Sequence, residues 1–404
     1  MNTSPKILLL SIIYPLPTKE NKGTPVCHYF TREWAKMDCD VRVVHFQNIY
    51  PAPFYWLAKL NREKIAAKTG AVVYTERDRG GCYEMDGVPV CRIPLFKPIP
   101  HGKYPKRTIN KSINTIVNWL GANDFTPDVI VGHFPNPMIE VVGRLKEFWP
   151  SAKTAIVLHG DIDIAEKVYG DCLVGLCNKI DLWGFRSEPI RRQFERQVMP
   201  VKNSFMCYSG IPESYITTQN MHTFCEPMKH FVYVGEMIER KYPVQVIDAL
   251  EKAYPNGDYQ LTYVGNGNLL NEIQKRILQE NLSDRVKALG KIPRENIKEQ
   301  YDAADCMVMI SRGEAYGLVY LEAMARGCIT IASRDEGFDG VIEDGENGFL
   351  CKAGDADELA NIISRINALT ASERQTISNN AIATAKSLTD YKAAKRYLDD
   401  LINK

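Results

Sequence analysis

The stretch SRGEAYGLVYLEAMARG, residues 311–327, begins at the last residue of the apolar run CMVMIS. A short apolar run bounded by turn residues is typical of a buried strand. At Gly317 the chain turns, and Leu318, Leu321 and Ala325 then recur at helical spacing. The stretch therefore predicts a strand, a glycine turn and a helix in that order, as in the repeating unit of an α/β fold.

The start of this helix is predicted to bind an anion. The amides from Gly317 to Val319 have no acceptor within the helix, and together with the helix dipole they favour a negative group such as a diphosphate. Glu314 precedes these amides, and Glu322 lies about 7 to 8 Å further along the helix axis. Carboxylates accept hydrogen bonds from vicinal hydroxyls. The order of first glutamate, amides and second glutamate therefore matches the order of hexose, diphosphate and ribose in a sugar nucleotide. Alternatively, both glutamates are solvated residues at a helix start, which the dipole alone would favour.

The composition is that of an ordinary globular protein. The chain has 404 residues, of which 45% are hydrophobic and 25% charged, and its length indicates two domains. The formal net charge of +1 provides no global field to recruit nucleic acid. The 11 cysteines contain no CxxC pair and no cluster with metal-ligand spacing. We therefore expect reduced thiols, a cytoplasmic protein and no bound metal.

Short apolar runs alternate with helical stretches along both halves of the chain, a pattern typical of parallel sheets covered by helices. The runs predict strands at 6–13, 41–46, 128–134 and 154–159 in the first half and at 230–234, 260–264, 286–289, 306–310 and 328–332 in the second, with a helix at 269–279. We therefore expect an α/β protein of two Rossmann-like, doubly wound domains that face each other across a cleft.

The boundary between the two halves is predicted at residues 209–228, because this stretch is polar and lacks a clear period. It would act as a hinge between an acceptor-side domain at 1–208 and a nucleotide-sugar domain at 229–385. Residues 386–404 are predicted to form a C-terminal helix that could pack back on the first domain. This helix would present an apolar stripe of Tyr391, Ala394, Tyr397, Leu398 and Leu401.

No segment of the sequence predicts a membrane span. The run KILLLSII at 6–13 is short and precedes a proline-rich turn, so it indicates a first strand and not a signal peptide. No other run reaches the ~18 apolar residues that a spanning helix needs. Residues 51–70 join aromatic and aliphatic side chains to basic ones, and 97–111 add a second basic stretch. They could contact anionic lipid at the inner face of the plasma membrane, or be an ordinary solvated helix face and loop.

The chain resembles the retaining GT-B glycosyltransferases of group 1, also numbered glycosyltransferase family 4. The family signature is a glutamate, seven residues, a second glutamate and an Ala-Met-Ala-x-Gly run, which here is Glu314, Glu322 and 323–327. By resemblance, Glu314 would hold hydroxyls of the donor hexose at the catalytic centre, and Glu322 would hold the ribose diol. The neighbouring residues that would contact the donor are Tyr316, Gly317, Leu318 and Val319.

In this family, an arginine and a lysine bind the diphosphate of the donor. The segment YVGEMIERKYP, residues 233–243, carries Lys241 at the family spacing from Gly235. The usual arginine after that glycine is Glu236 here, so the pair is broken unless Arg240 substitutes for it. Cations are unfavourable at a helix N-terminus unless an anion joins them. This favours diphosphate binding by Lys241 over a solvated helix start and leaves both interpretations open for Arg240.

Three further segments resemble donor-side elements of the family. Gly265 lies in the turn YVGNGNLL beside the nucleotide, and Lys291 and Ile292 lie in ALGKIP, where relatives contact the base through backbone groups. Because backbone groups are the same in every residue, the sequence does not identify the base of the nucleotide. Gly23 and Thr24 belong to the glycine-bearing loop after the first strand, near the donor phosphate or the acceptor.

His159, in VLHGD, matches a family histidine that would face the reacting sugar. Packing in the core is the alternative for His159, and also for His133, a second cleft candidate in VGHFPNP. Asp161 and Asp163 form a DxD triplet, which marks metal-bound nucleotide sugars in a different fold. Here they are predicted to cap a helix start, with Asp161 near the acceptor. Residues 336–339 would border the donor sugar.

The resemblance implies transfer of a hexose from a UDP- or GDP-sugar to a hydroxyl of a glycan or lipid-linked acceptor, with retention at the anomeric carbon. It also implies a role in surface polysaccharide synthesis and no metal or other cofactor. The catalytic residues would be His159, Glu314 and Lys241. One alternative is an epimerase or phosphorylase of the same fold. Another is a nucleotide-sugar-binding protein without activity, which the departure at Glu236 favours.

Overall fold

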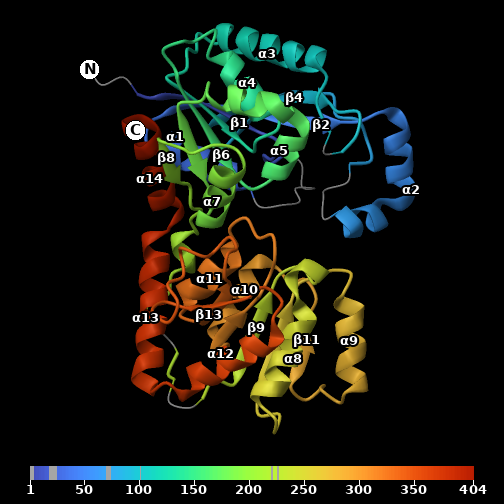
Figure 1. The fold of residues 1–404 in the computed structure, drawn as a ribbon, viewed down its shortest axis with the longest axis vertical. Helices are drawn as coiled ribbons and strands as arrows, with labels where there is room; N and C mark the ends of the chain where they lie inside the picture. The colour runs from blue at the N-terminus through green and yellow to red at the C-terminus, as the bar shows by residue number, and fades with distance from the viewer. Residues whose placement is uncertain (1–3, 18–24, 70–73, 101, 220–221, 225–226) are drawn as a thin grey trace. The chain divides into compact units, whose positions relative to one another are not determined.

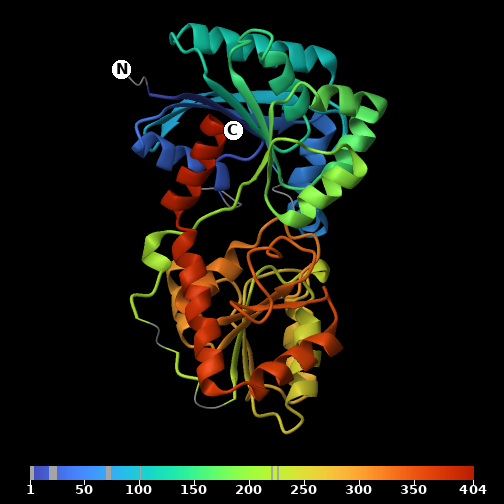
Figure 2. The same cartoon turned by 60° about the vertical axis from the view of Figure 1, so that its left-hand side comes forward.

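A computed structural model of the protein describes residues 4–17, 25–69, 74–100, 102–219, 222–224 and 227–404. The chain folds into two compact units, each with a sheet covered by helices (Figures 1 and 2). Unit 1 comprises Met1–Arg186, Ile190–Cys207 and Tyr391–Lys404, and unit 2 comprises Ser187–Pro189 and Tyr208–Asp390.

Unit 1 contains an eight-stranded sheet with the order β3-β4-β2-β1-β5-β6-β7-β8. Its strands are β1 (Lys6–Ser11), β2 (Asp40–Ile49), β3 (Gly81–Met85), β4 (Val88–Phe96), β5 (Val129–His133), β6 (Lys153–Leu158), β7 (Leu182–Phe185) and β8 (Ser204–Met206). Its helices are α1 (Val26–Lys36), α2 (Ala52–Thr69), α3 (Lys106–Gly121), α4 (Met138–Leu145), α5 (Ile162–Tyr169), α6 (Leu173–Cys177), α7 (Glu188–Gln197) and α14 (Asp390–Asn403).

The central strands of unit 1 are apolar throughout because helices cover both faces of the sheet. Successive side chains of a strand point to opposite faces. In β1, Leu8 and Leu10 pack in one core with α3 and α4, whereas Leu9 packs in a second core with α1 and α14. The indole N–H of Trp34 donates to the carbonyl of Ala394 (2.8 Å), which fastens α14 to the second core. The last helix of the chain is therefore part of unit 1.

Unit 2 contains a six-stranded parallel sheet with the order β11-β10-β9-β12-β13-β14 and one hydrophobic core. Its strands are β9 (His230–Val234), β10 (Gln260–Val264), β11 (Val286–Ala288), β12 (Cys306–Val308), β13 (Ile329–Ser333) and β14 (Phe349–Cys351). Its helices are α8 (Pro243–Ala253), α9 (Leu270–Gln279), α10 (Arg294–Asp302), α11 (Leu318–Arg326), α12 (Ala356–Ala368) and α13 (Ala371–Ser387). Both sheets have the doubly wound architecture that the sequence predicts.

The edge of the first sheet was not predicted. Residues 81–96 form an antiparallel hairpin of β3 and β4. The turn uses Asp86 and Gly87, with φ of 50° and 76°. β3 has no buried residue and β4 alternates buried and half-buried residues for most of its length, so neither is the continuous apolar run that predicts a strand buried on both faces.

Two details near the C-terminus differ from the predicted helix at residues 386–404. Residues 371–404 form two helices, α13 and α14, separated at Leu388 and Thr389. The prediction that Tyr391 belongs to the apolar stripe is wrong, because its side chain is 48% exposed while Ala394, Tyr397 and Leu401 are buried. In the described residues, no helix combines the length and apolar character needed to cross a bilayer.

Candidate functional site

The loops after four neighbouring strands of unit 2 meet at one edge of its sheet. The strands β11, β10, β9 and β12 are parallel, so their carboxyl ends share that edge. Backbone hydrogen bonds join the turns after β9 and β10: the amide of Gly235 donates to the carbonyl of Val264 (2.9 Å), and that of Met237 donates to Asn266 (2.9 Å). This edge carries most of the donor-binding residues that the sequence predicts.

Gly265 permits the close contact between these turns. Its φ is 145°, and a Cβ atom at this position would lie 1.9 Å from the carbonyl oxygen of Gly235. Its own amide donates to the carbonyl of Gly290 (2.9 Å). The packing of the turns therefore explains why glycine is needed, and contact between Gly265 and a nucleotide stays a prediction.

Lys241 and Glu314 form an ion pair at this edge. Nζ of Lys241 lies 3.3 Å from Oε2 of Glu314, and the two side chains are 12% and 16% exposed. Lys241 ends a single 3-10 turn (Glu239–Lys241) before α8. Although Nζ is within ion-pair distance, Oε2 is buried and has no hydrogen bond of good geometry in the described residues. The ammonium group therefore balances the charge of Oε2 and leaves the oxygen able to accept a hydrogen bond from a hydroxyl group.

Arg240 forms hydrogen bonds with the loop that leads to Glu314. Its guanidinium group donates to the carbonyls of Arg312 (3.2 Å) and Gly313 (3.4 Å), and its own carbonyl accepts from the amide of Arg312 (2.6 Å). Glu236, at the position of the family's usual arginine, is exposed. Arg240 thus lies beside Lys241 in the sequence, and one of its guanidinium nitrogens, Nη1, already binds backbone oxygens.

Helix α11 begins where the sequence predicts. Gly317 is its N-cap, with φ of 90°, and no side chain caps the helix. A Cβ atom at Gly317 would lie 2.5 Å from the ring of Tyr320 and 3.3 Å from Cγ of Glu314, so glycine is required by both space and conformation. In the described part of the chain the amides of Leu318 and Val319 have no acceptor. These two N–H groups can donate hydrogen bonds to an anion.

The side chain of Tyr316 faces the interior of unit 2. It is 3% exposed, and its hydroxyl group donates to the carbonyl of Ser209 (3.0 Å). Its ring packs edge-on against Phe338, with 5.4 Å between the ring centroids. Only the backbone of Tyr316 is therefore available for the donor contact predicted for this residue.

The loop after β13 packs directly on the Glu314 loop. A Cβ atom at Gly337 would lie 2.5 Å from both the carbonyl oxygen of Glu314 and the amide nitrogen of Tyr316. The amide of Glu314 donates to Oε2 of Glu336 (3.0 Å). Burial raises the pKa of Glu336, and hydrogen bonds from backbone amides oppose that shift. Glu336 thus contributes to the position of Glu314.

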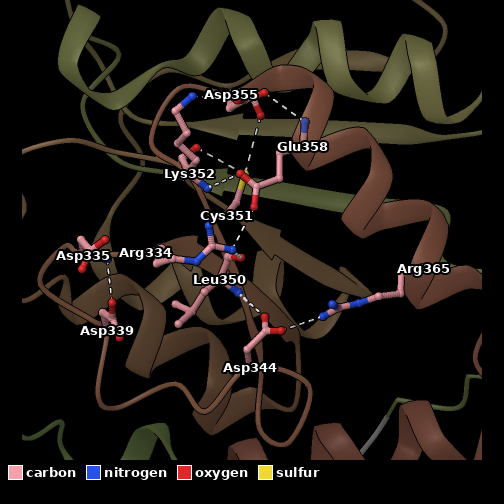
Figure 3. Close-up of polar contacts among 10 residues, drawn as sticks. All are labelled: Arg334, Asp335, Asp339, Asp344, Leu350, Cys351, Lys352, Asp355, Glu358 and Arg365. Carbon is pink, nitrogen blue, oxygen red and sulfur yellow. Dashed lines mark hydrogen bonds and ion pairs between the residues drawn. The ribbon is translucent and has the colours of Figure 1, made fainter.

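A polar network on β14 and α12 anchors both ends of the segment 334–344 that contains Glu336 (Figure 3). At one end, Arg334 binds the carboxylate of Glu358 (2.9 Å) and the carbonyl of Leu350 (3.0 Å). At the other end, Asp344 accepts from the amide of Leu350 (2.8 Å) and from Arg365 (3.0 Å). These hydrogen bonds hold both ends of the segment against β14 and α12.

Glu322 is already paired with a cation. It is 5% exposed, and its Oε1 accepts from Nη2 of Arg294 (2.8 Å). Burial raises the pKa of Glu322, and Arg294 opposes the shift. Arg294 was not singled out from the sequence, because nothing in its spacing connects it to Glu322. Nearby, Lys291 is exposed and Ile292 is half-buried.

The predicted catalytic His159 lies in unit 1 beside a second histidine. Nε2 of His159 is 2.9 Å from Nδ1 of His133, and the hydroxyl of Tyr397 is 3.2 Å from Nε2 of His133. The ring of Phe134 stacks on His159, with 4.1 Å between centroids. Burial lowers the pKa of His133 to about 3 and holds that of His159 well below its usual value, and the cation of Arg186 adds to both shifts. Both imidazoles are therefore neutral near pH 7.

The predicted capping role of Asp161 is wrong. Asp161 is the N-cap residue of α5, but it is in the left-handed region (φ 59°) and its side chain makes no capping hydrogen bond. A capping side chain reaches the first amides of a helix from an extended backbone. Gly23 and Thr24 lie outside the described residues. Within the described ranges, no three acidic, histidine or cysteine side chains are grouped to hold a metal ion.

Residues 219–384 match the family model described as glycosyl transferases group 1. The chain is 31% identical over 169 residues to N-acetyl-alpha-D-glucosaminyl L-malate synthase of Bacillus anthracis, covering 40% of this chain and 44% of the relative. It is 27% identical over 189 residues to the amylovoran biosynthesis glycosyltransferase AmsK of Erwinia amylovora, covering 44% and 46%. The chain therefore matches slightly less than half the length of these curated relatives.

Solved structures resemble the whole chain. The structure of Anabaena Alr3699/HepE in complex with UDP aligns with a TM-score of 0.67 and 19% identity over 98% of this chain and 99% of that one. The sucrose-phosphate synthase of Thermosynechococcus elongatus aligns with a TM-score of 0.65 and 17% identity over 98% of both chains. The chain therefore has the GT-B fold, and its residues 219–384 match the glycosyl transferases group 1 family model.

Proposed function

We propose that the chain is a retaining glycosyltransferase that moves a hexose from a UDP- or GDP-sugar to a hydroxyl of a glycan or lipid-linked acceptor. The observation that carries the proposal is the Lys241–Glu314 ion pair (3.3 Å), with Glu314 packed against Gly317 at the start of α11. One small region thus offers a cation and free amides for a diphosphate, and a carboxylate for sugar hydroxyls. The complex of Alr3699/HepE with UDP supports a nucleotide-linked donor.

Each of these groups would have a distinct part in the reaction. Glu314 would accept hydrogen bonds from the hexose hydroxyls and orient the sugar. Lys241 and the amides of Leu318 and Val319 would stabilise the negative charge that develops on the diphosphate as its bond to the anomeric carbon breaks. The acceptor oxygen would then bond to that carbon from the same face, and its proton would pass to a diphosphate oxygen. This route needs no nucleophilic side chain.

Two alanine variants test the proposal. Glu314→Ala and Lys241→Ala should each lower turnover by about 100-fold or more, because each removes a preorganised charge from the reacting groups. The assay is release of nucleoside diphosphate together with a lengthened acceptor. Lys275→Ala removes an exposed cation from α9 and is the matched control. Near-wild-type turnover in a folded Glu314→Ala or Lys241→Ala variant would refute the assignment.

The alternative function is nucleotide-sugar binding without transfer. The observation that favours it is Glu236, an exposed carboxylate where the family resemblance expects an arginine. Calorimetry with UDP-, GDP- and ADP-sugars separates the two functions. Donor binding with neither transfer nor slow release of nucleoside diphosphate, across a panel of hydroxyl acceptors, would support the binding protein.

A further inference from the structure

Unit 1 contains a cavity of about 1130 Å³ beside the edge hairpin. We call it the hairpin cavity. Helix α3 lies along β4 (Figure 1), and the cavity is lined by the first half of α3, by β4 and by residues 76–82, which lead into β3. Its volume is slightly above the range of about 300 to 1,000 Å³ that is usual for small-molecule sites.

The lining of this cavity is strongly cationic. It includes Arg77, Arg79, Arg92, Arg107 and Lys111, against the two carboxylates of Glu76 and Asp78. The whole chain has a net charge of only +1, so this excess of cations is concentrated locally. Like charges gathered around one space repel each other unless an anion joins them.

Among the residues that the structure describes, only one of the five cations has a carboxylate partner. Nε of Arg92 lies 3.2 Å from Oδ1 of Asp78, and that oxygen also accepts from the amide of Gly80 (2.6 Å). Within the described residues, no carboxylate lies within ion-pair distance of the remaining four cations, Arg77, Arg79, Arg107 and Lys111. Arg107 and Lys111 are also one helical turn apart on α3, where like charges are unfavourable.

The lining also contains groups suited to the body of a sugar. Ile93, Pro94 and Phe96 of β4 give an apolar wall, which can pack against the apolar face of a sugar ring. Ser112 and Thr115 use their hydroxyl groups on backbone carbonyls of α3. In the described part of the chain, the charged groups of the lining without an ion-pair partner include the four cations named above.

We propose that the hairpin cavity binds the phosphate or diphosphate group of a phosphorylated saccharide. Given the transfer reaction proposed above, this saccharide is the acceptor. A phosphate carries a charge of about −1.5 to −2 and three acceptor oxygens, whereas a single carboxylate is satisfied by one arginine. Four unpaired cations around one space thus fit a phosphate or diphosphate better than a carboxylate. The phosphate could belong to a soluble sugar phosphate or to a lipid-linked diphosphate.

A thiol-protection experiment tests this cavity directly. Cys82 lines the cavity and is exposed, whereas Cys172 is exposed and lies outside the lining. The full-length protein is alkylated with iodoacetamide, without donor, in the presence of a hexose phosphate, a prenyl diphosphate in micelles, inorganic pyrophosphate or a neutral hexose. Mass spectrometry then gives the rate at each cysteine. We expect a phosphorylated compound to slow the reaction of Cys82 and leave that of Cys172 unchanged.

The pattern across the compounds identifies the source of the phosphate. Protection by the hexose phosphate indicates a soluble ligand, and protection by the prenyl diphosphate alone indicates a lipid-linked one. The proposal is overturned if none of the phosphorylated compounds slows Cys82, or if the neutral hexose protects equally well. Because the experiment uses neither donor nor turnover, its result is independent of the proposed transfer reaction.

Single variants on α3 provide the second measurement. Arg107→Ala and Lys111→Ala should each raise the half-protecting concentration about tenfold, the effect of losing one charge-assisted hydrogen bond. Lys106→Ala removes an exposed cation from the same helix turn that does not line the cavity, and it should leave this concentration within about twofold. Equal protection in all three variants would show that the cations of the cavity do not bind the ligand.

Discussion

The hydroxyl oxygen of Tyr397 lies 3.2 Å from Nε2 of His133, whose Nδ1 lies 2.9 Å from Nε2 of His159. Tyr397 is 1% exposed, and its hydroxyl has no other hydrogen-bond partner in the described part of the chain. A buried O–H without an acceptor costs about 1 to 3 kcal/mol. Tyr397 should therefore donate to Nε2 of His133. The neutral His133 then carries its proton on Nδ1 and donates it to His159.

This chain of bonds predicts the tautomer of His159. With Nε2 of His159 accepting, its proton is on Nδ1, so the ring offers an N–H donor at its other side. Tyr397→Phe keeps the ring packing but removes the donor, and both histidines should then populate the reverse tautomer. Nitrogen-15 spectra of histidine-labelled protein measure this directly. Tyr104→Phe, which loses a buried hydroxyl bonded to Asn48, is the control. A proton on Nε2 of His133 in the wild type would contradict the argument.

Gly265 and Gly81 form a matched pair for measuring the contact between the turns. Both have a φ in the same region, 145° and 137°. An added Cβ would lie 1.9 Å from the carbonyl oxygen of Gly235 at position 265, but would meet nothing within 4 Å at position 81. Gly265→Ala should therefore lower the free energy of unfolding by about 2 to 3 kcal/mol more than Gly81→Ala. Denaturant unfolding gives both values, and equal losses would show that the turns separate easily.

The sequence predicted most of the strands that are buried on both faces, but not β7, whose four residues are all buried. The expected bounds of β9 and β10 are those observed, because each is a short, mostly apolar run followed by a glycine turn. The hairpin of β3 and β4 lacks such runs, and β8 and β14 have only three residues each. A signal for the hairpin was present in Asp86 and Gly87, a dipeptide that often joins two strands. The apolar runs typical of parallel strands do not include this signal.

The sequence also singled out both residues of the central ion pair, but not their contact. Lys241 and Glu314 are far apart in the sequence, and only the alignment of β9 and β12 in the sheet brings them together. The contacts of Arg294 with Glu322 and of Tyr397 with His133 depend on tertiary packing in the same way. Residue spacing carries no information on such contacts. The sequence therefore singles out individual residues, whereas the pairing of their side chains depends on the fold.

The buried histidines predict a stability that falls in mild acid. The pKa of His133 is lowered by burial from 6.5 to about 3, so between these values the unfolded chain binds a proton that the folded chain does not. The stability from neutral His133 is complete above pH 6.5 and is lost as the pH falls toward 3. The expected slope is about 1.4 kcal/mol per pH unit for one such histidine.

Denaturant unfolding between pH 4.5 and 7.5 measures this slope. His133→Gln should reduce it, because the titrating ring is gone while an amide can still hydrogen-bond to its neighbours. His230→Gln, which removes an exposed imidazole from β9, is the matched control. An unchanged slope in His133→Gln would mean that other groups cause the acid sensitivity.

Helix α2 exposes apolar side chains for which the sequence left open lipid contact or an ordinary solvated helix face. Trp56 and Leu60 are 66% and 63% exposed, whereas Ala58 on the same helix is 2% exposed. If this surface enters the headgroup region of anionic vesicles, Trp56→Ser and Leu60→Ser should each lower the fraction of protein that sediments with them. Loss of one buried apolar side chain should weaken partitioning about tenfold. Leu278→Ser, at a leucine of α9 that is 71% exposed, should change nothing. A wild-type protein that stays in the supernatant would show that α2 does not contact lipid and that its apolar side chains have another partner.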